Sequence, residues 1–427
     1  MFPIKSLFND SLVGKEVCIR GWVYRLREHK GKVFALIRDS TGVVQTVIAR
    51  DKFEADELED LAIESSVVVR GIVVKDKRAP SGYEVHVDEL KIIGPSHSFP
   101  ITKDYSETFL LDVRHLWIRS RRMTSILKVR SEVFELIHEY FRKRGYYEVH
   151  CPMFITAAVE GGATLFELDY FDKGKVYLTQ SSQFYLEALI YSLEKVYTIA
   201  PSFRAEKSRT RRHLTEFWHA EAEVAWAHLD DILKVEEELV THVVRGVLDS
   251  SIEELNLLKR NVKTLENVKP PFPRVSYDEV IEILNDKGFE IKWGEDLGAD
   301  EERALTLEFD KPIFVVGFPE SVKAFYHKND PKRPEVTLSA DLLAPEGYGE
   351  IIGGGERIED EKELIDKIIR FGLEPKSYEW YIDLRRYGSV PHSGFGLGVD
   401  RLVMWICGLD HIIHAIPFPR TIRRVYP

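Results

Sequence analysis

The chain has 427 residues, of which 44% are hydrophobic and 30% are charged. This length predicts two or more domains, and this composition excludes a disordered or a fibrous protein. The net charge of −11 excludes a uniformly basic nucleic-acid-binding protein, although the first 100 residues are electrically neutral and leave room for a local basic patch.

Three widely separated cysteines, Cys18, Cys151 and Cys407, form no CxxC pair. This pattern excludes a disulfide framework and a cysteine zinc site, and it is typical of a reducing compartment. No apolar run approaches the roughly 20 residues that span a bilayer, and the first residues lack the apolar segment of a signal peptide. We therefore expect a cytoplasmic protein with no membrane partner.

Residues 15–93 contain five short segments that are rich in β-branched and aromatic residues, with turn-forming residues between them. A polar, helix-like stretch, residues 51–63, lies between the third and the fourth segment. Five strands with one helix after the third is the order of an OB-fold, a barrel that often binds oligonucleotides. We predict this barrel over residues 1–95, and a linker or hinge over residues 96–115.

The rest of the chain mixes helices and strands in an irregular order. A long helical period has apolar residues at steps of three and four up to Gly145: Ile126, Val129, Val133, Ile137 and Phe141. Helical patterns are also predicted over 229–248, 277–288 and, last, near 396–408; strands and loops are predicted over 146–226, and strands with glycine-rich turns from about 310. This order predicts an α+β domain over residues 116–427, with a small insertion around 250–310, and not a doubly wound parallel sheet.

Two segments are candidates for binding phosphate. FRAEKSRTRRHLTEF, residues 203–217, gathers basic residues around Glu206 and His213, and GFGLGVDRLVMW, residues 394–405, places three glycines before Arg401. Taken alone, a segment like the first is more often a solvated charged loop, and one like the second a close strand–helix contact. The second segment is neither a Walker A loop nor a GxGxxG fingerprint.

Taken together with four further segments in order, these two resemble the motifs of class II aminoacyl-tRNA synthetases of the aspartyl/asparaginyl/lysyl subgroup. The further segments are YYEVHCP ending at Pro152, EGGA at 160–163, QSSQFY at 180–185 and EIIGGGER at 350–357. The resemblance covers nearly the whole chain and is greatest to the archaeal-type asparaginyl branch. It implies an N-terminal OB-fold β-barrel for the anticodon, a catalytic domain built on an antiparallel sheet flanked by helices, and a homodimer. It also implies that ATP and Mg²⁺ activate an amino acid, which is then esterified to tRNA.

The resemblance also implies the roles of residues at the nucleotide. Arg204 bridges the α-phosphate and the substrate carboxylate, and Arg401 binds the γ-phosphate. His213 is placed near the outer phosphates, Phe217 offers a face to adenine, and Glu206 accepts from the exocyclic amine. Such chemistry needs positioning and cations and no covalent nucleophile.

The resemblance also implies roles for five more residues, two at the metal ion and three at the amino acid. Glu350 and Asp341 are the Mg²⁺ ligands by position, and ligation by oxygen alone suits this ion. Without the resemblance, an acid in a loop is more often simply solvated. Glu160 and Gln183 are placed at the ammonium group of the amino acid, with Ser181 beside them.

Three positions indicate which amino acid is used. Aspartyl relatives place a lysine where this chain has Leu186, so one cation for a substrate carboxylate is missing. Arg357 remains to donate to an amide oxygen, and Glu221 is a carboxylate that accepts from a side-chain NH₂ and repels aspartate. We therefore predict L-asparagine as the substrate and tRNA(Asn) as the acceptor. The alternative is that Leu186 is part of the core and that Glu221 pairs with an arginine.

In the barrel, Phe34 and Gln45 lie eleven residues apart on adjacent predicted strands. In the subgroup this pair stacks on and hydrogen-bonds the central uracil of the anticodon, which suits the recognition of unpaired bases. Arg25 and Arg27 are predicted to serve phosphates or a neighbouring base. The alternative for Phe34 is a place in the barrel core.

Three other functions stay open from the sequence. The first is an aspartyl-tRNA synthetase, with or without discrimination between the two tRNAs. The second is an asparagine synthetase that uses the same catalytic core without tRNA, against which the predicted barrel argues. The third is a non-catalytic RNA-binding paralogue, against which the intact Arg204, Arg401 and Glu350 argue.

Overall fold

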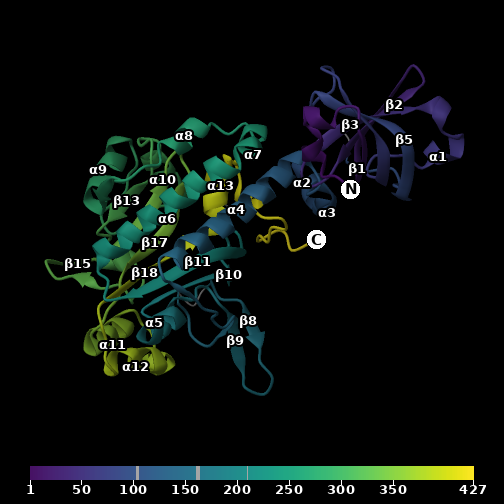
Figure 1. The fold of residues 1–427 in the computed structure, drawn as a ribbon. Helices are drawn as coiled ribbons and strands as arrows, with labels where there is room; N and C mark the ends of the chain where they lie inside the picture. Colours follow the sequence, from purple (N-terminus) through teal and green to yellow (C-terminus); the bar gives the residue numbers. More distant parts are fainter. Residues whose placement is uncertain (102–104, 160–163, 209) are drawn as a thin grey trace. The chain divides into compact units, whose positions relative to one another are not determined.

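The computed structural model describes residues 1–101, 105–159, 164–208 and 210–427. It contains two compact units, Met1–Leu110 and Leu111–Pro427 (Figure 1). Among the described residues, no helix has both the length and the apolar character that crossing a bilayer requires. The three cysteines all carry free thiols.

The first unit is a closed five-stranded barrel in the order β1-β2-β3-β5-β4, with one short helix after the third strand. Its elements are β1 (Glu16–His29), β2 (Lys32–Arg38), β3 (Val43–Ala49), α1 (Ala55–Glu59), β4 (Ser66–Lys75) and β5 (Tyr83–Gly94). On β2, the alternate residues Val33, Ala35 and Ile37 are buried in the barrel core, as the period of a strand requires. The predicted OB-fold order is confirmed.

The second unit is built on an eight-stranded sheet in the order β12-β13-β16-β17-β18-β11-β10-β6. Its strands are β6 (Tyr147–Glu148), β10 (Lys195–Phe203), β11 (Glu216–Ala225), β12 (Arg274–Ser276), β13 (Ile313–Val316), β16 (Ser339–Ala344), β17 (Gly349–Glu356) and β18 (His392–Gly398). All neighbouring strands are antiparallel except the outermost pair at each end of the sheet. The predicted antiparallel sheet is confirmed.

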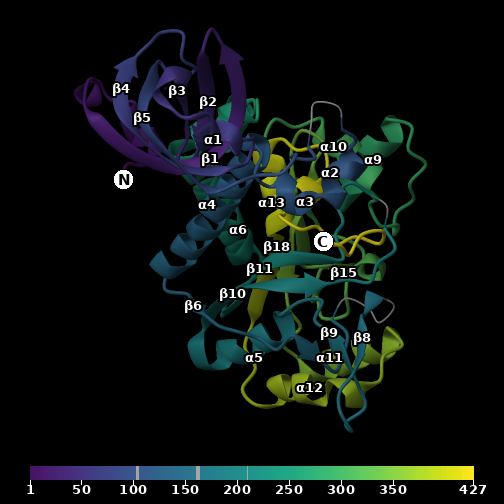
Figure 2. The same cartoon turned by 90° about the vertical axis from the view of Figure 1, so that its right-hand side faces the viewer.

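Three helices cover one face of this sheet: α4 (Arg121–Lys143), α6 (Leu229–Ser250) and α13 (Val399–Cys407) (Figures 1 and 2). The start of α4 is capped by the Ser120 hydroxyl, which accepts from the backbone N–H of Met123. Its predicted apolar residues, including Ile126 and Phe141, are all buried, so the long helix predicted before Gly145 is confirmed. The helices predicted over 229–248, 277–288 and near 396–408 are also present.

Three helices contradict the sequence prediction, which placed strands, turns and loops there: α5 (Gln183–Leu193), α11 (Glu361–Arg370) and α12 (Glu379–Arg386). The sequence of α5, QFYLEALIYSL, is apolar on most sides, so it lacks the alternation of polar and apolar faces that marks a surface helix. The start of α11 does carry a recognisable signal. Asp360 accepts from the backbone N–H of Glu363, and an acid at this place is a typical helix cap.

The remaining helices and short strands complete the second unit, apart from α2, which spans the division between the two units. They are α2 (Glu107–Asp112), α3 (Arg114–Trp117), α7 (Ile252–Leu257), α8 (Val262–Glu266), α9 (Tyr277–Asp286), α10 (Ala299–Thr306), β7 (Phe154–Ile155), β8 (Glu167–Asp169), β9 (Lys175–Leu178), β14 (Asn329–Asp330) and β15 (Arg333–Thr337). The helix α2 lies inside the stretch for which the sequence indicated no regular element, and its single buried apolar residue, Leu110, explains the weak pattern.

Candidate functional site

The floor of the candidate site is a row of residues that face one another across four strands. Glu221 on β11 pairs with Gly396 on β18, which pairs with Gly353 on β17, which pairs with Asp341 on β16. Because neighbouring strands lie about 4.8 Å apart, the two acids stand about 14 Å apart with two glycines between them. The floor is therefore open at its centre and acidic at both ends.

Glycine is required at neighbouring positions of this floor because the backbones and acids approach it closely. A Cβ on Gly354 would lie 2.7 Å from Cβ of Phe395 and 2.8 Å from the carbonyl oxygen of Gly394. A Cβ on Gly394 would overlap the carboxyl group of Glu223. At these positions a side chain cannot be accommodated without displacing its neighbours.

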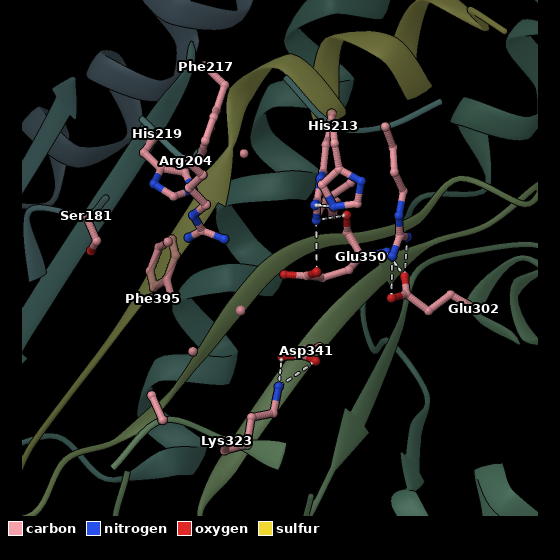
Figure 3. Close-up of a pocket in the computed structure, with 18 of the residues that line it drawn as sticks. Ser181, Arg204, His213, Phe217, His219, Glu302, Lys323, Asp341, Glu350 and Phe395 are labelled. Atoms are coloured by element: carbon pink, nitrogen blue, oxygen red, sulfur yellow. Dashed lines mark hydrogen bonds and ion pairs between the residues drawn. The ribbon is translucent and has the colours of Figure 1, made fainter. Parts of the chain in front are cut away.

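Above the floor lies a pocket of about 520 Å³. The sequence-predicted residues that line it are Ser181, Gln183, Arg204, Glu206, His213, Phe217, Glu221, Asp341, Glu350, Arg357 and Arg401. Figure 3 shows that labelled members of this set face one cavity from different strands and loops. The predicted Glu160 and the rest of its EGGA segment lie outside the described residues.

One side of the pocket is built around Arg401, in the first turn of α13. Its Nη1 donates to the carboxylate Oε2 of Glu350 at 2.8 Å and to the carbonyl oxygen of the same residue at 3.1 Å. Its Nη2 lies 3.3 Å from Nε2 of His213. Burial and, after it, the charge of Arg401 lower the pKa of His213 to about 4, so the ring is neutral and accepts from the guanidinium.

Opposite lies Arg204, which follows β10 directly. Its backbone N–H donates to the carbonyl oxygen of Thr215 at 3.0 Å, and its guanidinium carbon lies 5.4 Å from the ring centre of Phe217. His219 is close by and donates to or accepts from the Ser202 hydroxyl at 3.1 Å. Burial holds the pKa of His219 well below its ordinary value, so the ring carries no charge. The result is a cation beside a flat aromatic face, with the exposed Glu206 on the same loop.

The two predicted metal ligands lie on either side of Gly353: a Cβ there would be 3.3 Å from Oε1 of Glu350 and 3.4 Å from Oδ1 of Asp341. Both oxygens of Asp341 accept from Nζ of Lys323 at 2.7 Å (Figure 3). Burial alone would raise the pKa of Glu350, but Arg401 and Arg212 lower it to about 2. Burial raises the pKa of Asp341 to about 7, although Lys323 opposes this effect, so at neutral pH Glu350 is ionised and Asp341 is partly protonated. This donor set of oxygens suits a hard cation such as Mg²⁺. Among the described residues, no three His, Cys, Asp or Glu side chains form a ready-made metal site.

At the other end of the floor, Glu221 accepts from the hydroxyl of Ser181 and from the backbone N–H of Ser182, the latter at 2.8 Å. Gln183 is the first residue of α5, and its backbone N–H donates to the Ser181 hydroxyl at 3.1 Å. Leu186, in contrast, is fully buried in an apolar cluster and does not line the pocket. The alternative of a core residue is therefore the correct one for Leu186.

Arg357 is buried in an ion pair that the sequence did not predict. Its Nη2 donates to Oε1 of Glu223 at 2.6 Å, and both side chains are 2% exposed. Burial raises the pKa of Glu223 to about 8, although Arg357 opposes this effect. The guanidinium thus reaches the pocket already held in place by a neighbouring carboxyl group.

Sequence reasoning missed several lining residues: Arg212, His219, Glu223, Glu302 and Lys323. The segment HAEAE in β11 does contain a signal for two of them, because alternate residues of a strand share a face. His219 and Glu223 therefore had to lie on the same side as Glu221. No comparable pattern marks Lys323, which a loop carries to Asp341, or the ion pair of Arg212 with Glu302.

In the barrel, the predicted anticodon residues share one outer face. Arg27 pairs across the strands with Phe34, and its guanidinium carbon lies 4.8 Å from the centre of that ring. Leu36 pairs with both Arg25 and Gln45, which places these on the same face. Nε2 of Gln45 donates to Oε2 of Glu84 at 2.7 Å. The alternative of a core position for Phe34 is wrong, because its neighbours Val33 and Ala35 fill the core.

Comparison with known proteins agrees with this architecture. Residues 106–422 match the family described as tRNA synthetases class II (D, K and N), and residues 17–93 match the OB-fold nucleic acid binding domain. The asparagine–tRNA ligase of Thermococcus gammatolerans is 56% identical over 97% of this chain and 96% of its own length. The asparagine–tRNA ligase of Thermoplasma acidophilum is 52% identical, with all of both chains covered.

A solved structure is similar over the whole chain. The asparaginyl-tRNA synthetase of Pyrococcus horikoshii, complexed with asparaginyl-adenylate, has a TM-score of 0.97 and 53% identity, covering 100% of this chain and 99% of the other. The family match, the identities and the arrangement of the pocket agree with one another. The chain belongs to the class II tRNA synthetases of the aspartyl, lysyl and asparaginyl group.

Proposed function

We propose that this chain is an asparagine–tRNA ligase, which activates L-asparagine with ATP and transfers it to tRNA(Asn). The observation that carries the proposal is a single pocket with Arg204 and Arg401 on opposite sides, two acids on either side of Gly353, and the buried Arg357–Glu223 pair. Relatives with this name match the chain over its full length, which supports asparagine over aspartate.

The geometry suits an in-line attack of the amino-acid carboxylate on the α-phosphate of ATP. Two anions must be brought together in this reaction, so cations that hold both are the main requirement. Arg204 would contact both reacting groups, with the adenine against the neighbouring Phe217. Arg401 and the neutral His213 would bind the outer phosphates from the opposite side.

Mg²⁺ would be held by Glu350 and Asp341 and, when bound, would neutralise phosphate charge. Arg401 pairs with Glu350 and keeps it ionised, and Lys323 pairs with Asp341, whose raised pKa a bound cation would lower. We also propose that the protein forms a homodimer and is located in the cytoplasm. The short strand β6 supports the dimer, because it ends the sheet and its Tyr147 is 53% exposed.

The proposal is tested by amino-acid-dependent exchange of pyrophosphate into ATP, measured without tRNA. We expect exchange with asparagine and at least about a hundredfold lower kcat/KM with aspartate, because the carboxylate of Glu221 repels the like charge of the aspartate side chain. Exchange with aspartate as the better substrate would show an aspartyl enzyme with the same mechanism. Free asparagine formed from aspartate, ATP and ammonia would instead show an amidating enzyme.

The barrel should act only in the transfer step. We expect Phe34→Ala to lower kcat/KM for aminoacylation of tRNA(Asn) by about 10- to 100-fold, since one base–aromatic stack is worth about 1–3 kcal/mol. Pyrophosphate exchange should be unchanged, because Phe34 lies outside the unit that holds the pocket. Phe8→Ala is the matched control, since this ring also belongs to the barrel but packs against Tyr83. Equal losses in both assays would contradict the assignment.

A further inference from the structure

Glu187, one turn along α5 from Gln183, is a buried acid that the proposed mechanism does not use. Its side chain is fully buried, and four side chains contact its two oxygens. Oε2 accepts from Nη2 of Arg385 at 2.6 Å and lies 3.0 Å from Nε2 of His392. Oε1 accepts from Nε2 of Gln183 at 2.9 Å, and the Tyr381 hydroxyl bridges both oxygens at 2.8 and 2.9 Å.

These contacts keep Glu187 ionised. Burial alone would raise the pKa of its carboxyl group, but Arg385 and His392 outweigh burial, and the pKa lies well below its ordinary value. Arg385 is itself held by a second bond, from its Nε to the carbonyl oxygen of Ile358 at 2.8 Å. An ionised carboxylate accepts hydrogen bonds and donates none.

This property of Glu187 fixes the direction of a neighbouring amide. The amide of Gln183 has a donor end and an acceptor end, and only the donor end can face a carboxylate. The NH₂ group is therefore committed to Glu187, and the carbonyl oxygen Oε1 is at the opposite end of the amide. Gln183 lines the pocket and is 7% exposed, so this orientation decides which end of its amide faces a bound substrate.

We propose that Glu187 is a positioning residue for amino-acid binding: it holds the Gln183 amide so that the carbonyl oxygen accepts from the α-ammonium group of the substrate. The α-ammonium group carries only donors. An amide turned the other way would point its own NH₂ group at them and could not accept a hydrogen bond. The proposal rests on the proposed function in one respect, that the pocket binds an α-amino acid. It does not depend on the choice between asparagine and aspartate, because both carry this group.

The Glu187→Gln variant should turn the amide of Gln183. Arg385 donates at the position of Oε2, so the new carboxamide keeps its oxygen there and places its NH₂ at the position of Oε1. That NH₂ would then donate to Gln183, whose own NH₂ would face the ammonium. We expect the KM for the amino acid in pyrophosphate exchange to rise about 10- to 100-fold, the value of one hydrogen bond to a charged group. The KM for ATP should stay within about twofold.

A reciprocal exchange separates this role from a structural one. In the double variant Gln183→Glu with Glu187→Gln, the new carboxylate accepts from the neighbouring NH₂ and still offers an oxygen to the ammonium. We expect the KM for the amino acid to return to within about fivefold of the unchanged chain. The carboxylate partner of Arg385 is missing in both the single and the double variant. A purely structural role therefore predicts that the double variant is no better than the single one.

Tyr381→Phe is the matched control, because it removes a donor to Glu187 and leaves the bond from Gln183 intact. We expect a lower midpoint of thermal unfolding with an unchanged KM for the amino acid. An unchanged KM in Glu187→Gln, or a double variant without recovery, would overturn the proposal. Failure of the proposed function itself is a different result, because the unchanged chain would then support no exchange with any amino acid.

Discussion

Replacing Arg401 by alanine is expected to lower asparagine-dependent pyrophosphate exchange by about a thousandfold, the loss typical when a cation that stabilises phosphoryl charge is removed. The guanidinium is the donor that joins Glu350 and His213 at the end of the pocket where the outer phosphates would lie. The fall should appear in kcat more than in the KM for asparagine, because the amino acid would lie toward Gln183 and Arg357.

Two further variants show whether that loss comes from the charge and the two donor nitrogens of Arg401. Arg401→Lys keeps the charge but cannot donate from two nitrogens, so we expect an intermediate loss. Arg333→Ala is the matched control, because this arginine is also paired with carboxylates, Asp278 and Glu335, but on the surface of the molecule. It should retain full exchange activity. A loss of less than about tenfold in Arg401→Ala would contradict the placement of the phosphates at this residue.

Arg357→Met is expected to have the largest effect on stability. It lowers the free energy of unfolding by about 3 kcal/mol or more, because a fully buried carboxyl group loses its charged partner. The deficit should grow as the pH rises above 8. In the unchanged chain Glu223 then ionises beside Arg357, whereas in the variant its charged form has no cation and the folded state loses further stability. Denaturant unfolding at pH 6.5, 7.5 and 9 measures this directly.

Stability and substrate binding separate in the double variant Arg357→Met with Glu223→Met. Removing both charges restores most of the stability, because two apolar side chains of similar size no longer need a partner. Asparagine activation should not recover and should stay about a hundredfold lower, since the donor to the side-chain amide is absent. Recovery of both properties together would show that the pair has a structural role only.

The fold was largely predictable from local patterns. The barrel follows from alternation along single strands, and α4 and α6 follow from a helical period that packs one stripe of residues against the sheet. The helix α5 was not predictable in this way, because its polar residues Gln183 and Glu187 face the interior and give it no polar outer face. Its leucines and alanine favour a helix while its aromatic residues and Ile190 favour a strand, so composition did not decide between the two.

The site was predictable residue by residue but not pair by pair. Every predicted catalytic-domain residue that the structure describes lines one pocket, because the motifs lie on neighbouring strands of the sheet and on the segments next to them. The pairing of Arg357 with Glu223 depends on the register of β11, β18 and β17. No local pattern encodes that register, so the sequence could not indicate which of two nearby acids, Glu221 or Glu223, holds the arginine.

The glycine-lined floor has a consequence for redesigning the specificity of this protein. Gly396 and Gly353 at the centre of the floor carry no side chain, so this part of the binding surface is made of main chain and has no rotamers to vary. A library aimed at other amino acids therefore has existing side chains to vary only at the perimeter, chiefly those of β11 and the start of α5. Most polar side chains within that perimeter are buried and hydrogen-bonded, so a change must also supply a new partner, which makes the accessible alternatives few and widely separated.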